Sequence, residues 1–350
     1  MIECRAVELC TMLNLLKHLP RIEARAAMLS LGVGILLLGI KFCAYFLTGS
    51  TAIFADALEG IVNVTASGFA MYALVLAHRP PDPEHPYGHG KIEFFSAGLE
   101  GGMILLASVV AVSKAIDSLI RHQKFSITDL GPGLLLLVVA LLANALVGIY
   151  LIKVGQKQSS PTLQADGWHL ITDAVTSTAA MSALLIVWAT KWTPADPLIA
   201  ILVSIYIAWT GLRLMRKSAA GLMDEQDASD AAMLRKILDS HIGPSGKQPC
   251  ICSYHKLRHR HSGRYHWVDF HIVLPGGLDI ETGHQTASEI EYEIELALGE
   301  GNATAHIEPC KTQGCANCRV KETPTAPNIS VDAAVLPELA QDSLGNAVDV

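Results

Sequence analysis

The sequence is short of charged residues. Asp, Glu, Lys and Arg make up 17% of its 350 residues, whereas soluble domains carry about 25%. The deficit falls almost wholly between residues 26 and 217, and 51% of the whole chain is hydrophobic. The formal net charge is −7, so nothing indicates a basic surface for nucleic acid. The sequence also has no His-Glu-x-x-His motif, which argues against a zinc protease embedded in a membrane.

Six long apolar runs account for the missing charge. They cover residues 26–47, 51–77, 94–119, 130–154, 163–189 and 197–214. Crossing the hydrocarbon core of a bilayer, about 30 Å thick, takes about 20 helical residues. We therefore expect a six-helix transmembrane domain over residues 26–217, preceded by a cytosolic segment, residues 1–25.

Lys and Arg are unequally divided between the two sides of these runs. Six spans place both termini on one side, which carries eleven basic residues against three on the other. The two sets are Arg5, Lys17, Arg21, Arg25, Arg79, Lys91, Lys153, Lys157, Arg213, Arg216 and Lys217, and then Arg121, Lys124 and Lys191. Because basic loops stay in the cytosol, we expect a multi-pass protein of the plasma (inner) membrane with both termini cytosolic.

A polar region, residues 220–310, follows the membrane runs and is expected to be a cytosolic domain. Its patterns predict helices over residues 228–241 and 281–298 and strands over 252–260, 265–274 and 303–308, with Ser262-Gly263 as a hairpin turn. The order α-β-β-α-β indicates an α/β domain with helices on one face of a three-stranded sheet. Residues 311–350 are predicted to be a disordered tail. Whether Cys310, Cys315 and Cys318 bind metal is left open.

Two of the apolar runs each contain a polar pair four residues apart. Glu59 and Asn63 lie in the second run, and His169 and Asp173 lie in the fifth. Such residues share one face of a helix, and ionisable groups are costly inside a membrane. If the two helices touch, the four side chains supply mixed oxygen and nitrogen ligands for a divalent transition metal. The alternative is a pair of helix-packing contacts.

Two further groups of metal-ligand type lie outside these runs. The loop before the third run contains Asp82, His85 and His89, which could also be ordinary side chains of a solvated Pro-rich turn. In the polar region the candidates lie on separate predicted elements and are His255, His271, His284, His306 and Glu308. Surface histidines are the alternative there, and three further residues are equally suitable by type: His259, His261 and His266.

Three stretches together resemble the cation diffusion facilitator family of metal transporters. They are Ala55-Asp-Ala-Leu-Glu59 with Asn63, His85-Pro-Tyr-Gly-His-Gly-Lys91 after Asp82, and Ala165-Asp-x-x-His169-x-x-x-Asp173. The resemblance covers about residues 20–310. It implies six transmembrane helices with a metallochaperone-like cytosolic domain, and an ion pair between Lys91 and Asp224.

The resemblance also implies three metal sites. The transport site falls on Glu59, Asn63, His169 and Asp173, and the loop site on Asp82, His85 and His89. A binuclear cytosolic site, which helps to hold a homodimer, falls on His255, His271, His284, His306 and Glu308. The Glu59/Asn63 pair departs from the family's more usual His/Asp or Asp/Asp. One histidine with three oxygen donors is a harder set than zinc commonly takes, which admits iron, cobalt or manganese beside zinc.

The function that the resemblance implies is export of a divalent metal ion, zinc first among the candidates, in exchange for protons. His169 is the expected proton carrier, since histidine exchanges its proton near neutral pH. The expected partners are the metal ion, the proton and a second copy of the chain. A membrane-embedded metal sensor that signals through its cytosolic domain is the main alternative, and a channel without proton coupling is another.

Overall fold

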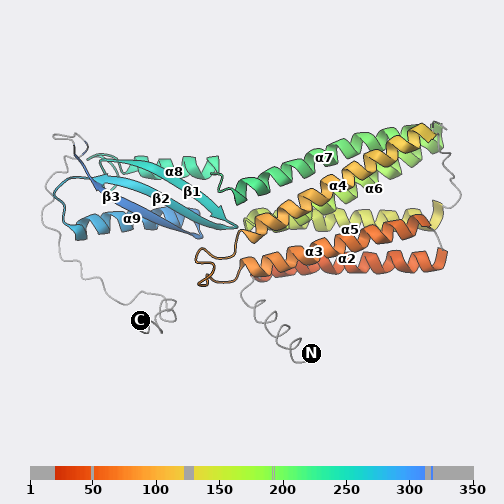
Figure 1. Cartoon of the computed structure of the whole chain (residues 1–350), viewed down its shortest axis with the longest axis horizontal. Helices are drawn as coiled ribbons and strands as arrows, with labels where there is room; N and C mark the ends of the chain where they lie inside the picture. Colours follow the sequence, from red (N-terminus) through yellow and green to blue (C-terminus); the bar gives the residue numbers. More distant parts are fainter. Residues whose placement is uncertain are drawn as a thin grey trace, which may run out of the picture.

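The computed structural model describes residues 20–48, 51–121, 130–190, 192, 194–311 and 317. The predicted N-terminal segment, apart from its last residues, lies outside this part of the chain. The predicted disordered tail beyond residue 311, with Cys315 and Cys318, lies outside it as well. The described residues form a bundle of long helices and, beyond one end of the bundle, an α/β domain (Figure 1).

All six apolar runs are helices. Their bounds are α2 (Arg21–Thr48), α3 (Thr51–Ala77), α4 (Ile92–Arg121), α5 (Leu130–Lys157), α6 (Pro161–Thr190) and α7 (Ala195–Leu222). They run side by side along the length of the bundle (Figure 1). The last helix continues past its predicted end at Leu214 and carries the chain to the α/β domain.

Four stretches within the described residues are long and apolar enough to cross a membrane. They are Arg21–Cys43, Ile92–Ile120, Val138–Lys157 and Pro197–Leu222. In the part of α3 whose side chains are described, an apolar stretch covers Asn63–Ala77. The polar pairs predicted from the sequence lie on α3 and α6, in each of which some side chains lie outside the described part of the chain.

The centre of the bundle is α6, which contacts each of the other five helices. It approaches α5 most closely at a glycine pair. A Cβ atom added to Gly167 would lie 2.9 Å from the carbonyl oxygen of Gly148 and 2.8 Å from Cγ1 of Ile152. Small residues let membrane helices approach to backbone contact. Since Gly167 is two residues before His169, this contact positions the part of α6 that carries the polar pair.

The α/β domain has the predicted order α-β-β-α-β. Its elements are α8 (Ala228–Ser240), β1 (Ser253–Ser262), β2 (Tyr265–Leu274), α9 (Ile280–Leu298) and β3 (Gly301–Pro309). The strands lie in the order β1-β2-β3. The first two pair antiparallel through the hairpin, and β2 and β3 pair parallel because α9 makes the crossover between them.

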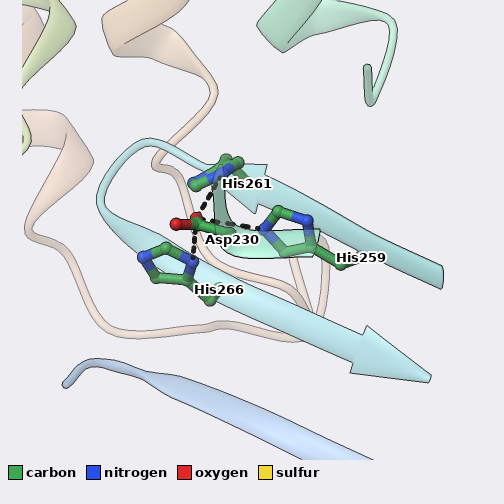
Figure 2. A group of neighbouring side chains, drawn as sticks. All are labelled: Asp230, His259, His261 and His266. Atoms are coloured by element: carbon green, nitrogen blue, oxygen red, sulfur yellow. Dashed lines mark ion pairs between the residues drawn. The ribbon is translucent and has the colours of Figure 1, made fainter. Parts of the chain in front are cut away.

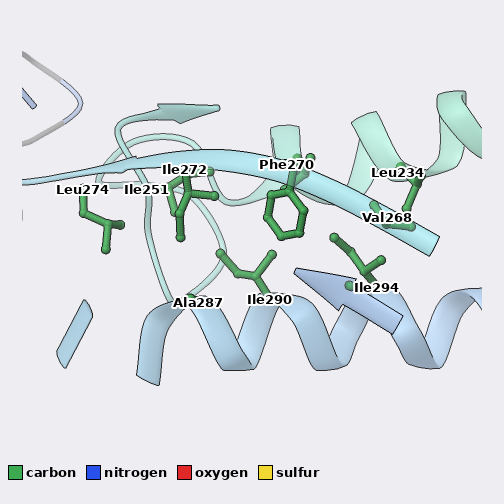
Figure 3. Close-up of a cluster of buried hydrophobic side chains, with 11 residues drawn as sticks. Leu234, Ile251, Val268, Phe270, Ile272, Leu274, Ala287, Ile290 and Ile294 are labelled. Atoms are coloured by element: carbon green, nitrogen blue, oxygen red, sulfur yellow. The ribbon is translucent and has the colours of Figure 1, made fainter. Parts of the chain in front are cut away.

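The core of this domain lies on one face of the sheet. Alternate residues of β2 point to this face, and Val268, Phe270, Ile272 and Leu274 are buried. They pack against buried side chains of both helices, which are Leu234, Leu238, Ala287, Ile290 and Ile294. Figure 3 shows the side chains of β2 directed toward α9. The predicted placement of both helices on one face of the sheet is therefore confirmed.

A β-bulge interrupts β1. His255 pairs with His271, but the next pair is Arg258 with Asp269, so two residues of β1 oppose Phe270. Lys256 in the bulge has a left-handed backbone, with φ 52°. A bulge of one residue changes which alternate residues face the core. His255 therefore lies on the outer face of the sheet, while residues 259 and 261 lie on the core face.

The core provides a first prediction. We expect Ile294→Ala, on the buried face of α9, to lower the free energy of unfolding of the α/β domain by about 2–5 kcal/mol. Leu296→Ala on the same helix is the matched control, because Leu296 is 71% exposed, and it should change the value by about 0.5 kcal/mol at most. Amide hydrogen exchange of β2 in the full chain measures both. Equal effects of the two substitutions would contradict the described core.

Candidate functional site

The membrane group is organised by Asn63. Its Nδ2 donates a hydrogen bond to Oδ2 of Asp173 at 2.9 Å, and its Oδ1 lies 3.2 Å from Nε2 of His169. His169 is only 7% exposed. Thus α3 and α6 do touch, and three of the four predicted residues meet. The side chain of Glu59 lies outside the described part of the chain, but its backbone is on α3 four residues before Asn63.

Two buried carboxyl groups lie near this group. Asp166, one turn before His169 on α6, is buried and accepts a hydrogen bond from the Ser67 hydroxyl at 3.0 Å. Glu100 of α4 is 1% exposed, and within the described residues neither of its carboxyl oxygens has a hydrogen-bond partner. Its charge interacts with that of Asp166. Glu100 was not among the predicted site residues, although an acidic residue inside the apolar run 94–119 is itself a signal in the sequence.

The loop before α4 brings its three predicted residues together. Oδ1 of Asp82 accepts a hydrogen bond from the His85 amide at 2.7 Å and lies 3.0 Å from Nδ1 of the same residue. Oδ2 lies 3.2 Å from Nε2 of His89. Partial desolvation acts to raise the pKa of Asp82. The hydrogen bonds from His85 and the charge of His89 outweigh it and hold this pKa below its ordinary value. An ionised carboxylate therefore faces two imidazoles.

The outer face of the sheet holds a third group, formed by His255, His271 and Glu308. Nδ1 of His271 lies 2.8 Å from Oε1 of Glu308, and Nε2 of His255 lies 3.5 Å from Oε2. The hydrogen bond with His271 lowers the pKa of Glu308. The ring of His306 lies 4.6 Å from that of His271. His284, by contrast, is exposed on α9 and lies outside this group.

A fourth group lies on the core face of the hairpin and contains Asp230, His259, His261 and His266. Figure 2 shows the Asp230 carboxylate between the three imidazoles. Burial, and then the charge of His261, lower the pKa of His259 below its ordinary value and that of His266 to about 4. These two rings are neutral at cytosolic pH. The three histidines were candidates by residue type only, and Asp230 was not among the predicted site residues.

The hairpin also joins the α/β domain to the bundle through ion pairs. Lys91 at the end of the loop lies 2.9 Å from Asp224 after α7, as the family resemblance implies. Arg260 of β1 lies 3.6 Å from the same carboxylate. On the other side of the hairpin, Arg264 lies 3.3 Å from the buried Glu23 of α2.

Aromatic and backbone contacts complete the junction. The ring of Tyr87 in the loop meets Trp267 of β2 edge to face, with centroids 4.9 Å apart. The loop backbone at Gly90 approaches the hairpin so closely that an added Cβ atom would lie 2.1 Å from the carbonyl oxygen of Ser262. The outer face of the hairpin therefore rests on the loop, whereas its core face holds the fourth group.

This close approach predicts the effect of Gly90→Ala. A Cβ atom cannot occupy a position 2.1 Å from a backbone oxygen, so the loop and the hairpin must separate. We expect the amides of residues 259–268 to exchange on the order of tenfold faster in the variant, which corresponds to about 1.4 kcal/mol. Gly276→Ala is the control, because its nearest contact would be an ordinary 3.4 Å. Unchanged exchange in Gly90→Ala would show that the junction opens freely.

The sequence profile of the cation efflux transmembrane domain matches residues 27–223, more than half of the chain. The chain belongs to the cation efflux family. Members are transporters, so this multi-pass membrane protein is a cation efflux transporter and not an enzyme. A second profile, ZT_dimer, the cytoplasmic domain of cation efflux proteins, matches residues 246–310. The α/β domain is therefore the cytoplasmic domain of the transporter. The name of its family refers to dimerisation.

Curated relatives of this cation efflux transporter span most of its length. An uncharacterized transporter of Synechocystis sp., sll1263, is 35% identical over 83% of this chain and 91% of its own. The cation-efflux pumps FieF of Salmonella arizonae and Escherichia fergusonii are each 28% identical, over 83% of this chain and 94% of theirs.

Two solved structures of CzrB, one in a zinc form, cover 24% and 23% of this chain and 98% and 81% of their own chains. Identity is 25% in both, with TM-scores of 0.22 and 0.19. Scores this low carry no argument about the site.

Proposed function

We propose that this efflux transporter carries a divalent transition-metal ion out of the cytosol in exchange for protons. The observation that supports this most directly is the contact of Asn63 with both His169 and Asp173. These side chains come from two helices and meet inside an apolar bundle, where polar groups mark ion pathways. Imidazole nitrogen and carboxylate oxygen are donors that a divalent transition metal accepts.

The same groups can couple the metal to protons. A ligating histidine must be neutral and a ligating carboxylate must be ionised, so metal binding releases protons and protons displace the metal. Nδ1 of His169 is buried and has no hydrogen-bond partner within the described residues. We propose that His169 and Asp173 take up protons from the outer side when the metal leaves. Alternating access then exposes the group to one side of the membrane at a time.

The cytosolic groups have a proposed role of their own. The loop group of Asp82, His85 and His89 and the outer-face group of His255, His271 and Glu308 are proposed to bind metal on the cytosolic side. The ring of His306 lies tilted against that of His271 in the outer-face group. His284 is exposed, so it is available to a second copy of the chain. We propose a homodimer in the plasma (inner) membrane with both termini cytosolic, and we keep zinc as the first candidate cargo, beside iron, cobalt and manganese.

Family membership bears on the alternatives. A sensor that signals only through its cytosolic domain does not need a polar group in the bundle, and the family is one of efflux transporters. The names of the FieF relatives, cation-efflux pumps, agree with transport. The remaining alternative is a channel without proton coupling, and a flux experiment in vesicles distinguishes it from a metal/proton exchanger.

The test is metal flux in sealed vesicles containing the purified full chain. Zn²⁺, Fe²⁺, Co²⁺, Mn²⁺ and Cd²⁺ are supplied one at a time, with internal pH recorded beside metal movement, with and without an imposed pH gradient. We expect proton flow opposite to metal flow, and faster metal movement when the gradient favours it. Metal movement without any proton flow would support the channel, and no movement with any of the metals would contradict the proposed transport.

A further inference from the structure

The fourth group has the arrangement of a metal site rather than of hydrogen-bonded pairs. Oδ2 of Asp230 lies 3.4 Å from Nε2 of His259, 3.3 Å from Nε2 of His261 and 3.5 Å from Nδ1 of His266. Hydrogen bonds from N–H to oxygen are about 2.7–3.2 Å long. Ligand atoms bonded at about 2.0–2.1 Å to a tetrahedral metal lie about 3.3–3.4 Å apart. The three distances from Asp230 match edges of such a tetrahedron, and all four ligand atoms lie within 4.8 Å of one another.

Burial supports the same conclusion. The side chain of His259 is fully buried, and those of His261 and His266 are 22% and 12% exposed. The three ring nitrogens that face Asp230 have no hydrogen-bond partner within the described residues. Polar atoms that are buried without a partner are unfavourable. On the face of the sheet where Val268 and Phe270 form the core, apolar side chains would be the stable choice unless the histidines bind something.

We infer that Asp230, His259, His261 and His266 form a further metal site, one that takes a four-coordinate transition-metal cation such as Zn²⁺ or Co²⁺. Three imidazoles and one carboxylate are the donors that these borderline cations prefer, whereas Mg²⁺ and Ca²⁺ prefer oxygen alone. The site is separate from the outer-face group, because the bulge in β1 places His255 on the opposite side of the sheet.

The position of this site gives it a structural consequence. Its ligands join the first turn of α8, the end of β1 and the start of β2. This is the hairpin end that carries Arg260 and Arg264, which contact Asp224 and Glu23 of the membrane domain. A bound metal therefore stiffens the part of the cytosolic domain through which it contacts the bundle. Cytosolic metal would strengthen this junction independently of the cargo in the membrane.

The test compares metal binding by the full chain in detergent, stripped of metal and titrated with Co²⁺ or Zn²⁺. His261→Asn removes a ligand of the further site, and His255→Asn removes one from the outer-face group. Arg258→Asn, an exposed residue between them on the same strand, is the matched control. We expect His261→Asn to bind one metal ion fewer per chain than the control and to lose one set of tetrahedral Co²⁺ absorption bands. His255→Asn should keep those bands.

Amide hydrogen exchange distinguishes loss of the metal site from misfolding of the variant. In the His255→Asn variant, Zn²⁺ should slow amide exchange of residues 259–268, whereas in His261→Asn it should not. His261→Asn is unsuitable if, without metal, it already changes amide exchange throughout the domain. In that case both measurements use Asp230→Asn instead, because this substitution conserves side-chain volume. Unchanged metal stoichiometry and spectra in the variant that remains folded would overturn the inference and leave a buried cluster of neutral histidines.

Discussion

Replacing Asp173 with Ala is expected to reduce metal flux by at least about 100-fold. The substitution removes the only carboxylate shown to contact Asn63 within the described residues, and leaves Asn63 Nδ2 without its 2.9 Å acceptor. Partners outside the first ligand shell are already worth about 10–100-fold in metal affinity, and a direct ligand contributes more. Proton flow driven by metal should fall in the same proportion, because one group is proposed to serve both ions.

The matched control for Asp173 is Thr176→Ala. Thr176 lies one turn of α6 further along and is exposed, and its hydroxyl donates to the backbone oxygen of Asp173. This variant should transport at close to the rate of the intact chain. Both proteins are reconstituted at equal density and assayed with each metal and with a pH-sensitive dye. If Asp173→Ala keeps the control's rate, the transport site must lie elsewhere in the bundle.

Replacing Gly167 with Leu is expected to prevent assembly of the helix bundle. Even a Cβ atom at this position would lie within 2.9 Å of the Gly148 oxygen and of the Ile152 backbone nitrogen. A whole leucine side chain therefore forces α5 and α6 apart along their contact. Because α6 touches every other membrane helix, the displacement reaches the contact of Asn63 with His169 and Asp173. The yield of monodisperse protein after detergent extraction should fall by on the order of tenfold or more.

Gly102→Leu tests whether this effect comes from the contact or merely from a bulky residue in a membrane helix. Gly102 lies on α4 three turns from its start, and an added Cβ atom would meet nothing within 4 Å. Its leucine variant should be extracted in the yield of the intact chain. A similar loss in both variants would attribute the effect to the leucine and not to the approach of α5 and α6.

The architecture could be predicted because its determinants are local. Apolar runs of membrane length and strands with alternating apolar residues specify their own structure, and every expected helix and strand is present. The differences lie at the ends, as in α7, which continues to Leu222. Arg213, Arg216 and Lys217 marked the end of the apolar pattern in the sequence, but a helix can continue into the cytosol beyond the bilayer once its side chains reach water.

The arrangement of the histidines could not be predicted to the same extent. Strict alternation along β1 would place His255, His259 and His261 on one face, yet the bulge at Lys256 separates them. A single sequence does not mark a bulge, since the residue there is an ordinary lysine. The partnership of Asp230 with the hairpin is also tertiary, as it depends on how α8 packs over the sheet. By contrast, the contact of His261 with His266 follows directly from a hairpin turn at Ser262-Gly263.

The two arginines of the hairpin connect helices that belong to different parts of the bundle. Arg264 reaches Glu23 on α2, which packs with α3, while Arg260 reaches the carboxylate that follows α7, which packs with α4. A rocking motion of one helix pair against the other, as alternating access would require, would change the distance between these two anchoring points. We therefore expect at least one of the two ion pairs to break or rotate during such a motion. On the proposed mechanism, the two ion pairs would connect the cytosolic domain mechanically to the step that opens the membrane site.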